Sequence, residues 1–108
     1  MYAGIVKAIA SLADDIDIEP GATVSKVLVK DGPVRLVLFA LDEGEELTEH
    51  TSSLPVILQT VSGSITVSAS SERHVLVPGG WIFLEASEPH TVVAEEPSKF
   101  LLTMLRGG

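Results

Sequence analysis

The chain contains no cysteine, which excludes disulfide bonds, thiolate zinc sites and cysteine nucleophiles. Aromatic residues make up only 5% of its 108 residues, so a folded core has to be built mainly from Val, Ile, Leu and Ala. Positive charge is also scarce, because 7 Lys and Arg stand against 15 Asp and Glu, for a formal net charge of −8. A surface of this sign repels phosphate backbones and anionic lipids, so we expect neither nucleic acid nor a membrane as a partner.

Long apolar runs are absent as well. The longest, residues 34–41, is interrupted by Arg35 and is far too short to span a bilayer. The N-terminus shows no charged leader followed by a long apolar stretch, so we expect no signal peptide and a cytoplasmic protein. The composition, 45% hydrophobic and 20% charged residues, is that of a globular protein. Its length suits one hydrophobic core rather than two.

From residue 22 onward, short runs rich in Val, Ile and Leu alternate with turn residues such as Asp31-Gly32 and Pro78-Gly79. This rhythm predicts about eight strands at roughly ten-residue spacing. Such spacing favours an all-β sandwich or barrel over alternating strands and helices. The predicted strands are residues 24–29, 34–41, 56–61, 64–68, 74–77, 81–84, 90–94 and 100–105.

The N-terminal residues follow a different pattern. Between residues 2 and 13 the apolar side chains recur at the spacing of one helical face, which predicts an amphipathic helix of about two to three turns. Alternation over residues 5–9 would equally fit a strand. The acidic stretch that follows ends in Pro20-Gly21 and predicts a loop. We therefore expect residues 1–21 to pack on the barrel or on a dimer partner, and residues 22–108 to form the barrel.

Two stretches of the chain each place a histidine a few residues after a glycine. In the first, five residues separate Gly44 from His50, and Gly63 ends the stretch. In the second, ten residues separate Gly79 from His90. The two stretches resemble the paired motifs of the cupin superfamily, and the resemblance covers about residues 22 to 105. It implies an all-β double-stranded β-helix, the jelly-roll barrel of small single-domain cupins of the cupin 2 type.

The metal-binding positions of these motifs are only partly kept. In the family, two His and a Glu of the first motif and one His of the second converge on a metal inside the barrel. Here His50 and His90 match, whereas Ser52 and Val56 stand at the second His and the Glu. In the second motif, family residues are also replaced at positions 85, 87 and 94. The resemblance is therefore informative about fold and leaves the function open.

We expect His50 and His90 to meet in the barrel lumen. Imidazole suits Fe, Ni, Cu or Zn, and an added carboxylate would favour Mn. Two imidazoles hold a metal weakly, so a third ligand would improve the site. The best local candidate is Gln59, although strand alternation places it opposite Val56 unless a bulge intervenes. We predict a ligand site formed by His50, His90, Gln59 and Ser52, in which His50, His90 and Gln59 could also hold a divalent metal.

Three functions remain open. The chain could be a cupin that binds a small carboxylate-bearing or sugar-like ligand, with or without a metal. It could be a metal-dependent dioxygenase or isomerase. It could also be a metal-free acid–base enzyme like the sugar epimerases, with one His as general base. That last reaction would also need a partner acid such as tyrosine, and the only tyrosine is Tyr2.

Other features receive simpler interpretations. We expect His74 to be a surface or edge residue and Trp81 to be an interface or core anchor. The acidic residues between positions 42 and 49 are expected in a solvated loop. We also expect a homodimer in which the N-terminal segment contributes, because exposed edge strands are otherwise a liability.

Overall fold

The computed structural model of the chain describes residues 6–30, 32–50 and 53–106. Within them lie nine strands and one short 3₁₀ helix. The elements are η1 (Leu12–Asp14), β1 (Thr23–Val29), β2 (Val34–Leu41), β3 (Glu46–His50), β4 (Val56–Ser62), β5 (Ile65–Ala69), β6 (Glu72–Leu76), β7 (Trp81–Leu84), β8 (His90–Ala94) and β9 (Ser98–Leu105).

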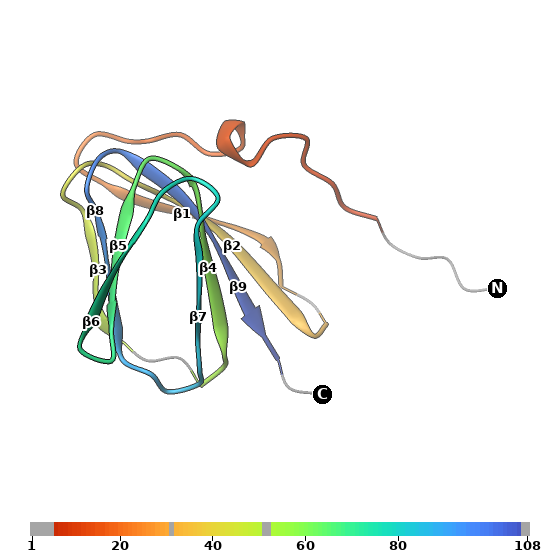
Figure 1. Cartoon of the computed structure of the whole chain (residues 1–108). Coiled ribbons are helices and arrows are strands. Elements are labelled where there is room, and N and C mark those ends of the chain that lie inside the picture. Colours follow the sequence, from red (N-terminus) through yellow and green to blue (C-terminus); the bar gives the residue numbers. More distant parts are fainter. Residues whose placement is uncertain (1–5, 31, 51–52, 107–108) are drawn as a thin grey trace.

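The strands form two antiparallel sheets that face each other across a single core (Figure 1). The first sheet has the order β1-β2-β9-β4-β7 and the second the order β3-β8-β5-β6. The strand rhythm predicted an all-β sandwich or barrel, and the resemblance implied the jelly-roll barrel that these two sheets form. Because side chains alternate between the faces of a strand, β2 and the strands from β4 to β9 send alternate residues inward. The resulting core contains Val37, Leu41, Val56, Leu58, Ile65, Val67, Ala69, Leu76, Leu84, Val92, Ala94, Phe100 and Leu102.

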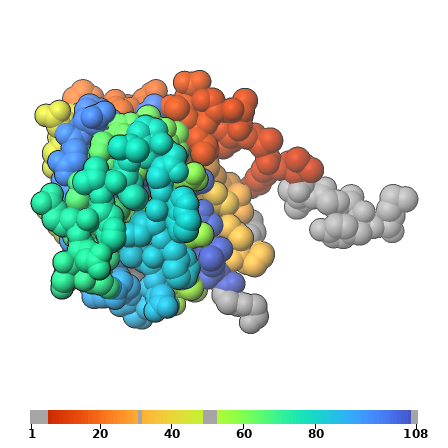
Figure 2. Space-filling model, viewed as in Figure 1, coloured from red at the N-terminus to blue at the C-terminus, as the bar shows by residue number. Residues whose placement is uncertain are grey.

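The predicted N-terminal helix is wrong in the residues that the structure describes. Residues 6–11 adopt no regular structure and are all exposed, and only η1 is helical. A helix of this length is marginal in water without a surface on which to bury its apolar side. The chain finds such a surface further on, where Ile16 packs on Leu38 and Ala40 on the outer face of the first sheet. The segment thus crosses one end of the barrel and then projects away from it (Figures 1 and 2).

Strand β3 was missed by the sequence analysis, which placed its acidic residues in a loop. Its pattern is weak because Leu47 is its only apolar residue, and Leu47 packs against the core. The exposed Glu46 lies beside it on the opposite face. One inward apolar residue among polar neighbours does not produce a recognisable alternation.

One end of the barrel, which we call the closed end, is built around Gly63 and Ser98. Gly63 has a φ of +77°, and a Cβ there would overlap the carbonyl oxygen of Pro97. Ser98 is fully buried, and its Oγ accepts a hydrogen bond from the N–H of Ser64 at 2.9 Å. The final glycine of the first motif is therefore required by backbone conformation and by the close approach of another loop.

The seam between β6 and β7, the edge strands of the two sheets, is bridged near the same end. The hydroxyl of Thr60 donates to the carbonyl of Leu76 at 3.0 Å, and both residues are buried. The N–H of Gly79 donates to the carbonyl of Thr60 at 2.9 Å, and the N–H of Thr60 donates to that of Gly80 at 3.0 Å. These bonds join the two sheets where no strand ladder does.

The loop after β2 attaches the N-terminal segment to this end. The carboxylate of Asp42 accepts hydrogen bonds from the N–H groups of Gly21 at 2.7 Å and of Glu43 at 2.9 Å. These bonds stabilise the charged form and lower the pKa of Asp42 below its ordinary value, with Gly21 the larger cause. Lys26 adds a salt bridge of 3.0 Å to Asp15.

Candidate functional site

His90 is the first residue of β8 and is 4% exposed, so its side chain lies inside the barrel. Its Nδ1 lies 2.9 Å from the carbonyl oxygen of Glu88. A carbonyl can only accept, so Nδ1 carries the proton and the lone pair of the neutral ring is at Nε2. This tautomer is the one in which histidine binds metals or accepts hydrogen bonds through Nε2.

The backbone of His50 pairs directly with that of His90 across the ladder between β3 and β8. A register shift between Leu47 and His50 produces this pairing. The chain therefore brings the two motif histidines to neighbouring backbone positions at the same end of one sheet. The side chain of His50 and the whole of Ser52 lie outside the described residues, so Ser52 stays a prediction.

Gln59 is a correction to the predicted ligand set. Its side chain is exposed, whereas Val56, Leu58 and Thr60 are each 2% exposed and face the interior. The ladder between β4 and β9 is regular from Val56 to Thr60, and its register shifts only between Thr60 and Ser62. Without a bulge before it, Gln59 points away from the lumen and is separated from His90.

A resident metal fits this donor set poorly. Val56 is buried where the family motif has its carboxylate, and a Val side chain offers no donor atom. Among the described residues, no group of three or more His, Asp and Glu is placed to hold an ion. At most, His50 and His90 would supply two ligands, which leaves the remaining positions to water or to another molecule. Weak binding through these two imidazoles stays a prediction.

A cavity of about 380 Å³ opens between β5, β6 and β7, at the end of the barrel opposite Gly63. We call this end the mouth. Its floor is Ala69, and the apolar wall across from β6 contains Ile82 and Leu84. His90 is not among its lining residues, although its backbone pairs with that of Ala69. The lining comprises Ala69, Ser70, Glu72, His74, Ile82, Phe83, Leu84, Glu85 and Glu88.

Glu72 and His74 line the cavity, which the sequence pattern did not predict. His74 does lie on an edge strand, as predicted, but it shares a face of β6 with the buried Leu76. That face looks into the barrel. The sequence signal for this orientation is the alternation of Glu72, His74 and Leu76, which places all three on one face of a strand. The polar hairpin before β6 resembles a fully solvated turn and hides that alternation.

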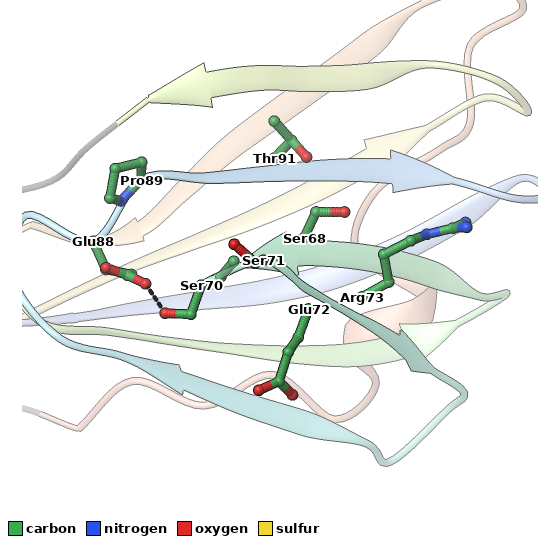
Figure 3. A pocket seen from close by; sticks show the side chains of 9 residues that line it. Ser68, Ser70, Ser71, Glu72, Arg73, Glu88, Pro89 and Thr91 are labelled. Atoms are coloured by element: carbon green, nitrogen blue, oxygen red, sulfur yellow. Dashed lines mark hydrogen bonds between the residues drawn. The ribbon is translucent and has the colours of Figure 1, made fainter.

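A second, wider groove of about 650 Å³ crosses the other side of the same hairpin (Figure 3). Arg73, Ser68 and Thr91 are cross-strand neighbours and share its outer face. Glu72 leaves β6 in the opposite direction from Arg73 (Figure 3). The hydroxyl of Ser70 donates to the carboxylate of Glu88, which joins the hairpin to the loop before β8.

Known structures share this fold. A cupin superfamily protein from Desulfitobacterium hafniense superposes with a TM-score of 0.87 at 19% identity, covering 95% of this chain and 94% of that one. A cupin 2 conserved barrel domain protein from Leptotrichia buccalis gives 0.83 at 25% identity, over 87% of this chain and 46% of that one. KdgF from a Halomonas species gives 0.73 at 27% identity, over 85% and 86%. No protein-family model and no curated protein matches the chain by sequence.

The chain therefore has the cupin fold, as its two motifs predicted. At these identities the likeness concerns the fold, and the function has to be argued from the site. Within the described residues we find no helix with the length and apolar character that a membrane span requires.

Proposed function

We propose that the chain binds a small molecule at the mouth of the barrel, beside His90. The observation that carries this proposal is the cavity of about 380 Å³ whose floor, Ala69, pairs with the buried His90. Its size lies within the range of small-molecule sites, and it combines an apolar wall with a few polar groups, as such sites do. His90 does not line the cavity and supports its floor from the neighbouring strand.

Filling the floor of the cavity tests this proposal. Ala69→Leu should abolish binding of a library of sugars, amines and short carboxylates, followed by amide chemical shifts in the ¹⁵N-labelled chain. In the unmodified chain those shifts should concentrate at the mouth. Ala10→Leu adds the same volume to an exposed position and should change nothing. Overpacking costs about 1–3 kcal/mol, so circular dichroism must first show that Ala69→Leu folds. Shifts confined to other surfaces would contradict the proposal.

Metal-dependent chemistry, as in a dioxygenase or isomerase, is the second candidate. The pairing of His50 with His90 and the tautomer of His90 support it. Metal content should be measured on protein without a His tag and on a His50→Ala, His90→Ala double variant. A stoichiometric Mn, Fe, Ni, Cu or Zn that the variant loses would favour the enzyme, and no metal in either sample would remove it. The epimerase alternative is weaker, because the only tyrosine of the sequence, Tyr2, stands outside the two barrel motifs.

We also propose that the chain forms a homodimer through the outer face of the first sheet. Trp81 is 62% exposed and Phe83 46% exposed there, so Trp81 is not a core anchor. The projecting N-terminal residues add Val6, which is 89% exposed. Both features expose apolar surface that a second copy of the chain would bury across a two-fold interface.

Light scattering tests the dimer. The chain should elute at twice its monomer mass of 11.4 kDa, and Trp81→Glu with Phe83→Glu should give monomers. Val75→Glu is a matched control, because Val75 is 63% exposed on the second sheet and should leave the dimer intact. A monomer before any substitution would overturn the proposal.

A further inference from the structure

The mouth is organised by one row of residues that crosses the second sheet. Glu72 pairs with Ala69 across β6 and β5, and Ala69 pairs with His90 across β5 and β8. Directly paired residues of antiparallel strands share a face. Glu72, Ala69 and His90 therefore point to the same side, which is the inner side, because Ala69 and His90 are buried.

The middle of this row is nearly empty. Ala69 is the smallest side chain in it, and it leaves space between the longer side chains of Glu72 and His90. Neighbouring strands are about 4.8 Å apart, so the two flanking positions are about 10 Å apart. A small molecule seated on Ala69 would thus lie beside the carboxylate of Glu72, while the buried His90 stands behind the lining on the next strand.

His74 extends the recognition surface toward the seam. It lies two residues from Glu72 on the same face of β6, and its Nε2 is 3.8 Å from Oε2 of Glu72. The side chains of His74 and Glu72 are 40% and 71% exposed, so both can contact a molecule that enters from solvent. Across the cavity, Ile82 and Leu84 offer only apolar contacts.

Charge at the mouth is of one sign. Glu72, Glu85 and Glu88 line the cavity, and the described lining residues include no Lys or Arg. The nearest cation along the strand, Arg73, is on the outer face with Ser68 and Thr91 (Figure 3). An anionic ligand would meet carboxylates without a compensating cation, whereas ammonium or hydroxyl donors would find acceptors.

We propose that Glu72 and His74 are ligand-binding residues of the mouth, and that the ligand presents an ammonium or hydroxyl group to Glu72 rather than a carboxylate or phosphate. This inference rests on the proposed binding of a small molecule at the mouth. The sequence left a sugar-like or a carboxylate-bearing ligand open. The inference keeps the sugar-like ligands without negative charge and excludes the carboxylates.

Three sugars of the same shape and different charge test the inference. Glucosamine, glucose and glucuronate should be titrated separately into the ¹⁵N-labelled full chain at neutral pH, with mouth amides as the readout. The expected order of affinity is glucosamine, then glucose, then glucuronate. Glu72→Gln should weaken glucosamine about tenfold, the loss of one charge-assisted hydrogen bond. His74→Asn should weaken both glucosamine and glucose.

Glu96→Gln is the charge-matched control, because it removes the same charge from an exposed position in the turn before β9. It should change affinity less than twofold. Equal weakening by Glu72→Gln and Glu96→Gln would show a general field and overturn the role of Glu72. Tightest binding of glucuronate at the mouth would overturn the ligand class and leave the proposed function standing. If none of the three sugars shifts the mouth amides, the ligand class and the roles of Glu72 and His74 fall, and the wider library decides the proposed function.

Discussion

The two ends of the barrel are made from the same strands and differ in how their polar groups are used. At the closed end, Ser98 and Thr60 are buried and hydrogen-bonded, and Gly63 leaves no room for a side chain. At the mouth, Ala69 leaves a cavity, and the carboxylate of Glu72 faces solvent. The difference separates residues that hold the sheets together from residues that are available to a ligand.

The largest effect should come from Gly63→Ala. The new Cβ would meet the carbonyl of Pro97 while the backbone holds a positive φ, so we expect a loss of about 3 kcal/mol or more in the free energy of unfolding. Urea denaturation measures this loss. Gly79→Ala is the control, because Gly79 has a φ of +90° and a Cβ added there would meet no atom within 4 Å. It should lose only about 1 kcal/mol, from backbone strain. Equal losses would contradict the tight packing at Gly63.

Thr60→Val should have the next largest effect. The substitution keeps the shape of the side chain but removes the buried bond to the Leu76 carbonyl, which costs about 1–3 kcal/mol. Thr103→Val, on the partly exposed outer face of β9, is the matched control. Urea denaturation should separate the two, and equal stabilities would mean that the seam is held by other contacts.

Substitutions at the mouth should barely change stability. Glu72→Gln and His74→Asn alter exposed or half-exposed side chains, so we expect changes within about 0.5 kcal/mol. Thermal unfolding of both variants beside Thr60→Val checks this. A large loss in either variant would erase the contrast between the two ends and would give the mouth residues a structural role.

The smallest effect concerns acid. The pKa of Asp42 is lowered in the folded chain, so its contribution is present above the ordinary Asp value of 3.8 and disappears as pH falls through the lowered pKa. Asp42→Asn should flatten the acid limb of stability against pH, measured by urea midpoints. Glu43→Gln, beside it on the exposed loop, should leave that limb unchanged. An unchanged slope in Asp42→Asn would show that its bond to Gly21 does not matter.

The sequence predicted strand bounds correctly where apolar residues were dense. Strands β2, β7 and β8 have the bounds that their composition predicted. Strand β3 was missed because a bulge and charged neighbours hide its single inward Leu47. The N-terminal helix was wrong because spacing shows which residues are apolar and not what surface will bury them. The contribution of that segment to a homodimer interface stays a prediction.

The site was predicted less completely than the fold. The motifs predicted that His50 and His90 would meet, and their backbones do pair. The register shift that produces this pairing cannot be read from the spacing. Gln59 was misplaced because the choice between a regular strand and a bulge depends on the partner strand. The positions of Glu72 and His74 in the cavity lining were not predicted, because they depend on the pairing of β6 with β5, and neither strand's sequence shows that pairing.

The attachments of the N-terminal segment divide it in two. Asp15, Ile16 and Gly21 are each tied to the barrel by an ion pair, by packing or by a backbone bond, whereas residues 6–11 are exposed. Trypsin should therefore cleave after Lys7 in the native chain and release a short peptide. The remaining protein should keep its urea midpoint, since Val6 and Lys7 are exposed.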